Sequence, residues 1–231
     1  MTEQERLPIV VIACEIFEHM LKQHLPEEVT EQAAFLEYGL HRVPHKIANT
    51  VQMHLDDLQT PSLVVLGYGL CGNGIKGVRS GKHTLLVPRM DDCIAMLLGS
   101  RSAYLREFSA VPGTYWLSKG WLESGSHPLK EYEEYSEKYG PEDAEWLMDT
   151  QYQHYERLVL VTHTQNDMDR YRPQAQAVGK FCERWDFGYE EILGSDRFVK
   201  RLAEVAQDLN KTDKEFVIIP PGGEIRMEQF F

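Results

Sequence analysis

Three of the four cysteines in this sequence fall just beyond the points where predicted β-strands end. Cys14 closes an apolar run, Cys71 follows a second run and a glycine turn, and Cys93 lies six residues beyond a third run. In open α/β sheets, ligands bind outside the carboxyl ends of the strands. We therefore expect these cysteines, although they are far apart in the sequence, to gather in one crevice.

Three thiolates in one crevice are the ligand set of a soft metal. Zinc with three protein ligands and one open position is typical of a catalytic site, where the metal lowers the pKa of a bound thiol or water. An iron–sulfur cluster with one open iron is the alternative. A free cysteine also behaves as a small buried hydrophobe, which is our interpretation of Cys182 within a predicted helix. The repetition at three strand ends favours a metal site for the other three.

Two acidic residues and two histidines are candidates to complete this site. Glu15 directly follows the first cysteine, and Asp92 directly precedes the third, where it serves as a helix cap, an oxygen ligand or a proton carrier. His41 lies just beyond the second predicted strand and is the third candidate for acid–base chemistry. His163 follows a strand of the second half and is a candidate fourth metal ligand. For each histidine, a structural role is the alternative.

Glycine-rich loops follow two of the predicted strands. Residues 67–74 contain a GxGxxG pattern, but too few residues separate it from the next strand for the long helix of a dinucleotide-binding fold. We interpret this segment as a loop that lets Cys71 and free backbone N–H groups approach a ligand, and such amides lower the pKa of a thiol. A simple turn is the alternative. The glycines predicted to line the site are Gly69, Gly72, Gly74, Gly222 and Gly223.

The elements that must position these residues follow from the hydrophobic pattern. Continuous apolar runs predict buried parallel strands, and apolar residues at helical spacing predict helices between them. In the first half, strands are predicted at residues 7–13, 33–40, 63–66, 84–87 and 113–117. The predicted helices cover residues 15–25, a segment that opens at Pro44 and ends before Pro61, residues 93–98 and residues 103–108.

The second half continues this alternation after a polar break. Residues 125–150 are rich in Tyr, Glu and Lys, which predicts one or two exposed helices. Further strands are predicted at 158–162, 187–193 and 216–219, with helices at 173–185 and after Asp196.

Alternating strands and helices predict a Rossmann-like α/β protein, with mostly parallel sheets and helices on both faces, in one or two lobes. We expect an N-terminal lobe with the cysteine site at residues 1–122 and a polar helical connection at 123–152. A C-terminal lobe at 153–231 would complete the crevice.

The composition is that of a globular protein and argues against polyanionic partners. The chain has 231 residues, of which 26% are charged, and its formal net charge is −12, which is unfavourable for nucleic-acid binding. No segment approaches the roughly 18 apolar residues of a membrane span. The start is not basic and the first apolar run is too short for a signal peptide, so we expect a cytoplasmic protein with reduced cysteines. A small molecule is the expected substrate, without a membrane partner.

Several of these segments, in combination, resemble the DUF1638 family. They are residues 12–15 (Ile-Ala-Cys-Glu), 40–44, 67–72 (Gly-Tyr-Gly-Leu-Cys-Gly), 92–101 and 113–121. Cys14, Cys71, Cys93 and His41 occupy positions that look like motif positions of the family. Members are often encoded beside corrinoid-dependent methyltransferases. The resemblance therefore implies a role in one-carbon or corrinoid chemistry, with a corrinoid protein or a methyltransferase as partner.

Three functions are open at this point. The first is a zinc-binding protein or enzyme of corrinoid-linked methyl metabolism, in which Cys14, Cys71 and Cys93 bind the metal. Its open position would take a substrate thiol, a water or His163, and methyl transfer would be its reaction. The second is an iron–sulfur redox enzyme. The third is a non-catalytic module that binds a small metabolite or corrinoid through the aromatic segment 113–123 and the glycine loops. We favour the first.

Overall fold

The computed structural model describes residues 7–231, so the first six residues of the predicted N-terminal lobe lie outside the described residues. The chain forms two compact units. Unit 1 contains the residues up to Arg101 together with Asp196–Phe231, and unit 2 contains Ser102–Ser195. These boundaries differ from those expected at residues 122 and 152. The difference arises because the last long helix and the last strand pack with the N-terminal strands rather than with their neighbours in sequence.

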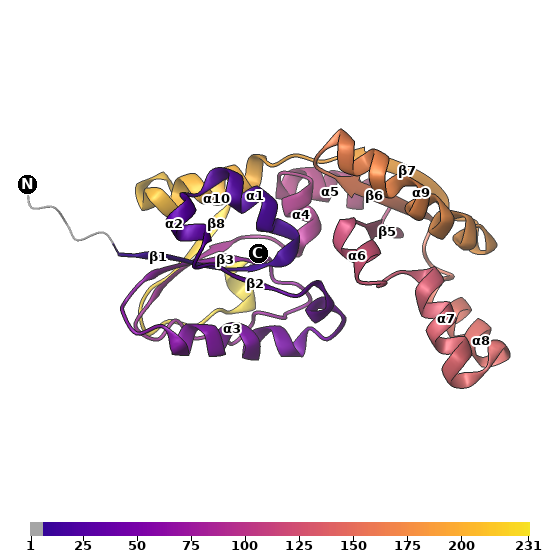
Figure 1. Cartoon of the computed structure of the whole chain (residues 1–231), viewed down its shortest axis with the longest axis horizontal. Coiled ribbons are helices and arrows are strands. Elements are labelled where there is room, and N and C mark those ends of the chain that lie inside the picture. Colours follow the sequence, from indigo (N-terminus) through magenta and orange to yellow (C-terminus); the bar gives the residue numbers. More distant parts are fainter. Residues whose placement is uncertain (1–6) are drawn as a thin grey trace, which may run out of the picture. The chain divides into compact units, whose positions relative to one another are not determined.

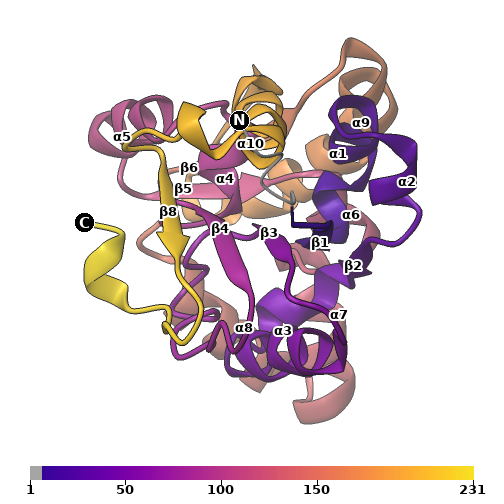
Figure 2. The same ribbon diagram turned by 90° about the vertical axis from the view of Figure 1, so that its left-hand side faces the viewer.

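A five-stranded sheet with the order β2-β1-β3-β4-β8 forms the centre of unit 1 (Figures 1 and 2). The strands are β1 (Ile9–Cys14), β2 (Ala34–Leu36), β3 (Leu63–Gly67), β4 (Thr84–Pro88) and β8 (Phe216–Ile219). The first four are parallel, and β8 runs antiparallel to β4. The predicted α/β fold with a mostly parallel sheet is confirmed. All residues of β3 are buried, as its continuous apolar run requires in the middle of a covered sheet.

Helices cover both faces of this sheet. Helix α3 (His45–Asp57) lies on one face, whereas α1 (Glu18–His24), α2 (Glu27–Thr30) and α10 (Arg197–Gln207) lie on the other (Figure 1). Helix α3 begins after Pro44 as predicted, because the proline ring presets φ and the first turn needs no N–H there. The shorter helical segments of unit 1 are α4 (Cys93–Leu97), η1 (Glu15–Phe17), η2 (Tyr38–Arg42), η4 (Leu209–Lys211) and η5 (Met227–Gln229).

Unit 2 is built on a parallel three-stranded sheet with the order β5-β6-β7. Its strands are β5 (Thr114–Leu117), β6 (Arg157–Thr162) and β7 (Gly188–Leu193). Its helical segments are α6 (Lys119–Glu123), α7 (Pro128–Tyr139), α8 (Pro141–Tyr152), α9 (Gln165–Cys182) and η3 (Glu183–Trp185), while α5 (Arg101–Ala110) begins at the last residue of the first part of unit 1. The polar segment 125–150 therefore forms two helices, α7 and α8, which turn at Gly140, a glycine with φ of 89°.

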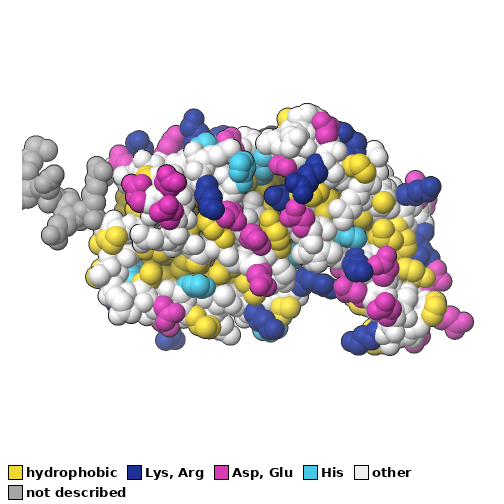
Figure 3. All heavy atoms as spheres, viewed as in Figure 1, with side chains coloured by type: hydrophobic (Ala, Val, Ile, Leu, Met, Phe, Trp, Pro, Cys, Tyr) yellow, Lys and Arg dark blue, Asp and Glu magenta, His cyan; other side chains and the backbone are white. Residues whose placement is uncertain are grey.

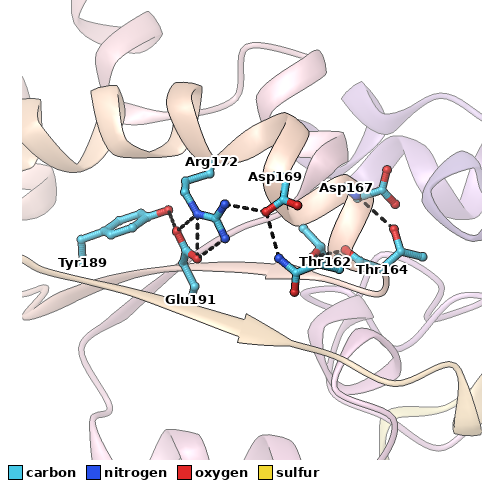
Figure 4. Close-up of polar contacts among 8 residues, drawn as sticks. Thr162, Thr164, Asp167, Asp169, Arg172, Tyr189 and Glu191 are labelled. Atoms are coloured by element: carbon cyan, nitrogen blue, oxygen red, sulfur yellow. Dashed lines mark hydrogen bonds and ion pairs between the residues drawn. The ribbon is translucent and has the colours of Figure 1, made fainter.

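Helix α9 is longer than the predicted helix at 173–185 and contains Pro173 in its interior. The true start is set by Thr164, whose Oγ1 accepts a hydrogen bond from the N–H of Asp167 at 3.0 Å. Figure 4 shows this cap and, one to two turns along, the Arg172 guanidinium between Asp169 and Glu191 of β7. The ion pair of Arg172 with Glu191 anchors α9 to β7 directly before the proline, and the helix continues beyond the proline to Cys182.

Charged side chains do not segregate by sign on the face drawn in Figure 3, where Lys and Arg are interspersed with Asp and Glu. Within residues 7–231, no helix combines the length and the apolarity that crossing a lipid bilayer requires.

Candidate functional site

Cys14, Cys71 and Cys93 lie at the C-terminal ends of three neighbouring strands of unit 1. Cys14 is the last residue of β1, Cys71 lies in the loop after β3, and Cys93 begins α4 after β4. Strand β3 pairs with β1 and with β4, and all three are parallel. The strand order also reverses between β1 and β3, which is where doubly wound sheets open their ligand crevice. The structure therefore brings the three residues, called the cysteine cluster, to one edge.

The three thiols are near enough to affect one another's charge. The pKa of Cys71 is raised mainly by burial and further by the charges of Asp92 and Cys14. The pKa of Cys93 is raised by burial first and then by Cys71, Asp92 and Cys14. In addition, the backbone N–H groups of Gly69 and Cys93 donate toward the sulfur of Cys71, which places this sulfur at the first residue of α4.

The loop after β3 is held against the segment that precedes α4. The N–H of Cys71 donates a hydrogen bond to the carbonyl oxygen of Asp91 at 2.9 Å. The N–H of Leu70 donates to the carbonyl oxygen of Met90, also at 2.9 Å. A Cβ atom on Gly69 would lie 3.1 Å from three backbone atoms of Asp92. Because backbone atoms cannot swing aside, the close approach of the two segments depends on glycine at this position.

Cys71 stands in a strained stretch of backbone. Its φ is 49°, and those of Gly72 and Asn73 are 63° and 67°, so three consecutive residues are left-handed. This conformation costs about 1–2 kcal/mol for each residue that carries a Cβ. Strain of this kind is concentrated at functional sites, where the surrounding structure enforces it. Here the bonds of the loop to the segment before α4 provide that support.

The three thiols are partly buried, and their loss of hydration favours the protonated form. Burial raises the pKa of Cys14 to about 11, and it also holds the pKa values of Cys71 and Cys93 above the usual value. Backbone N–H groups lower all three values, as expected for amides beside a thiol, but the loss of hydration is the larger effect. Coordination of a ligand by these sulfurs therefore requires release of their protons.

Tyr68 belongs to this site, although the sequence pattern did not single it out. It directly follows β3, is 4% exposed, and packs in the same core cluster that Cys14 and Cys71 adjoin. Burial and then the charges of all three clustered cysteines raise its pKa, so its hydroxyl lies within electrostatic reach of each. The hydroxyl oxygen is buried and has no hydrogen-bond partner among the described residues. The signal in the sequence is a polar aromatic residue directly after a fully buried strand.

Both predicted acidic residues lie beside the cluster. Asp92 caps α4, since its Oδ1 accepts a hydrogen bond from the N–H of Ile94 at 2.9 Å, and its charge also acts on Cys71 and Cys93. Glu15 begins η1 directly after the first cysteine and raises the pKa of that thiol. The carboxylate of Asp92 thus both caps α4 and acts on the cysteine cluster. Proton transfer by Asp92 or by Glu15 stays a prediction.

The two histidines occupy different units. His41 lies in η2, beyond a strand β2 that is shorter than predicted because it is an edge strand paired only with β1. Its Nδ1 is 2.6 Å from the carbonyl oxygen of Tyr38. His163 follows β6 and belongs to unit 2, whereas the cysteine cluster belongs to unit 1. Acid–base chemistry by His41 and metal binding by His163 stay predictions.

The predicted glycines divide between the two edges of the sheet. Gly69, Gly72 and Gly74 lie in the loop of Cys71, although a Cβ on Gly74 would meet Ile47 of α3, so that glycine serves packing. Strand β8 is antiparallel, and its last residue pairs near the start of β4. The following Gly222 and Gly223 therefore lie at the opposite edge, where Gly222 donates to Gly81 at 2.8 Å. The structure does not bring these two glycines to the cysteine cluster, which corrects the expectation that they line it.

A sequence model of one protein family matches residues 35–203, which is more than half of the chain, and its description reads "Protein of unknown function (DUF1638)". This chain belongs to the DUF1638 family. Comparisons with curated proteins and with solved structures found no match. The matched region of the DUF1638 protein includes Cys71 and Cys93, while Cys14 precedes it.

The donor set of the DUF1638 protein fits a soft metal ion, since thiolates select zinc, copper(I) and iron–sulfur clusters. In the structure as it stands, no three Cys, His, Asp or Glu side chains of residues 7–231 are arranged to hold a metal ion. A cysteine sulfur is redirected by rotation about χ1 alone. The present side-chain positions of the cysteine cluster therefore do not form a metal site, and metal binding at the cluster stays a prediction. Cys182, in contrast, is fully buried in the core of unit 2 and serves packing.

Proposed function

We propose that this DUF1638 protein binds a zinc ion through Cys14, Cys71 and Cys93 and acts in the methyl transfer chemistry of small thiols. The convergence of the three cysteines at neighbouring strand ends is the observation that carries the proposal. Three thiolate ligands leave one of the four tetrahedral positions for a substrate, as in catalytic zinc sites.

The protein's own residues would prepare this site in two ways. The core behind the cluster limits the access of water, because Cys14 and Cys71 adjoin the same apolar side chains as Tyr68. The carboxylates of Asp92 and Glu15 stand beside thiols that must release protons when they coordinate a metal, and carboxylates are suited to accept them. A bound zinc ion would supply Lewis acidity that lowers the pKa of a coordinated thiol.

The substrate and the partners are proposed on different grounds. A small thiol fits because its sulfur is a soft ligand for the open position. A corrinoid protein or a methyltransferase as partner rests on the family resemblance alone. We place the protein in the cytoplasm, because a reducing compartment preserves the four free cysteines.

Metal analysis of protein purified without oxygen tests this proposal. We expect about one zinc per chain, and a Cys93→Ser variant should retain less than about 0.2, since two thiolates do not hold zinc tightly. Cys182→Ala is the matched control and should keep the wild-type content. Brown protein that contains iron and sulfide would instead support the iron–sulfur alternative. A wild-type content below about 0.2 for every transition metal would contradict both metal sites and leave the non-catalytic binding module.

A further inference from the structure

The hydroxyl of Tyr68 is an unused hydrogen-bond donor in the wall of the cysteine cluster. The side chain is 96% buried, because its exposed fraction is 4%, and its oxygen has no partner among the described residues. A buried hydroxyl without a partner is unfavourable, and native proteins rarely keep one unless a ligand or an ordered water completes the bond. The three thiols lie within electrostatic reach of this hydroxyl, and sulfur is a weak acceptor.

The charges around the hydroxyl limit which acceptor fits. Asp92 and Glu15 stand beside the thiols, and each sulfur that coordinates a metal becomes a thiolate. Three thiolates and two carboxylates would outweigh the two positive charges of a bound zinc ion, so another negative charge would be repelled, which disfavours a carboxylate on the ligand. A neutral oxygen, such as a hydroxyl, accepts the bond from Tyr68 without that repulsion.

We propose that Tyr68 donates a hydrogen bond to a neutral oxygen of a small thiol bound at the cysteine cluster, and so selects hydroxyl-bearing thiols over simple alkyl thiols. This inference rests on the proposed function and adds the chemical class of the substrate. Tyr68 is then a specificity-determining residue that contacts the substrate. The Tyr68 hydroxyl, which has no partner among the described residues, would bind the substrate's oxygen, whereas the metal would bind the substrate's sulfur.

The test uses full-length protein loaded with Co²⁺, whose visible spectrum changes when a thiol binds. 2-Mercaptoethanol and 1-propanethiol have the same number of heavy atoms and differ in the hydroxyl group. We expect the wild type to bind 2-mercaptoethanol about five- to tenfold more tightly, the ratio that one neutral hydrogen bond supplies. Mercaptoacetate, which carries a carboxylate, should bind more weakly than 2-mercaptoethanol.

Tyr68→Phe keeps the ring and removes the donor. This variant should bind 2-mercaptoethanol about as weakly as 1-propanethiol, with unchanged affinity for the latter. Tyr189→Phe in unit 2 is the matched control and should keep the wild-type preference. A merely structural role of Tyr68 would weaken the binding of both probes equally.

The outcomes separate this inference from the function on which it rests. Wild-type protein that binds neither Zn²⁺ nor Co²⁺ would overturn the proposed function and the inference with it. Protein that binds the metal but shows equal affinity for the two thiols would overturn only the inference. The same holds if Tyr68→Phe raises the melting temperature and leaves the preference intact, because the hydroxyl would then be an unpaired core group.

Discussion

Gly69 sets how closely the loop of Cys71 approaches the segment that carries Cys93. Its missing side chain leaves room for the backbone of Asp92, and the neighbouring left-handed residues turn the loop so that the Cys71 sulfur reaches the start of α4. At the scale of single residues, the geometry of the site thus depends on the missing Cβ of Gly69 as well as on the three cysteines. The raised pKa values of the thiols follow from the same close packing, because it removes water from them.

A Gly69→Ala substitution should therefore damage both stability and metal binding. The added Cβ would lie 3.1 Å from backbone atoms, and overpacking of this kind costs about 1–3 kcal/mol. We expect a lower free energy of unfolding in urea and a lower zinc content. Gly39→Ala is the control, because nothing lies within 4 Å of a Cβ at that position. Equal effects of the two substitutions would show that the contact with Asp92 does not matter.

Helices α4, α7 and α9 each begin at a residue whose side chain caps the first turn, and the cap of α7 can change its charge. His127 precedes α7, and its Nδ1 accepts a hydrogen bond from the N–H of Lys130 at 3.3 Å, which only a neutral ring with an unprotonated Nδ1 can do. Burial is the main cause that lowers the pKa of His127, and Lys130 lowers it further, against the opposing effect of nearby glutamates. The helix therefore depends on a histidine that stays neutral.

The stability of unit 2 should accordingly decrease in mild acid. The pKa of His127 in the folded protein lies below its usual value of 6.5, so the unfolded chain binds the proton more readily. The free energy of unfolding is then largest above pH 6.5 and falls as the pH decreases below it, by about 1 kcal/mol for one cap. His127→Asn keeps a cap and removes the titration, so it should flatten this dependence.

Urea unfolding followed by tryptophan fluorescence measures this effect, because all four tryptophans of the chain lie in unit 2. Wild type and His127→Asn should differ most at about pH 5.5 and least at about pH 7.5. Parallel pH profiles of the two proteins would refute the role of His127.

At the scale of the whole molecule, unit 2 is an insertion between two parts of unit 1. The two chain segments that lead into and out of it meet within unit 1, since Arg197 donates to the carbonyl oxygen of Gly99 at 3.0 Å. Each unit has its own sheet and its own apolar core. The three cysteines, Asp92 and Tyr68 all belong to unit 1, so the proposed site lies within that unit.

Replacement of residues 102–195 by a short Gly/Ser linker should leave unit 1 folded, because the ends to be joined are already close. We expect the shortened chain to retain zinc, and residues 102–195 alone to fold without binding it. Circular dichroism and metal analysis of the two products provide the measurement. Loss of zinc from the folded, shortened chain would show that unit 2 supplies a ligand, for which His163 is the candidate.

The sequence by itself determined the elements and the placement of the cysteines. Continuous apolar runs mark strands that are buried on both faces, and Pro44 marks the start of α3, because these signals are local and report burial and φ directly. The alternation of strands and helices was enough to predict a mostly parallel sheet. With that sheet, the position of three cysteines after three strands was enough to place them at one edge.

Only the tertiary structure decided which elements became neighbours. Strand β8 pairs antiparallel with β4, which puts Gly222 and Gly223 at the far edge and returns residues 196–231 to unit 1. Helix α9 continues through Pro173 because contacts with β7 outweigh the local preference for a helix start. The position of Tyr68 directly after β3 can be read from the sequence, but the sequence does not show that its hydroxyl lacks a hydrogen-bond partner among residues 7–231. Strand pairing and burial from solvent depend on contacts between residues that are distant in the sequence. A short segment of sequence therefore does not predict them.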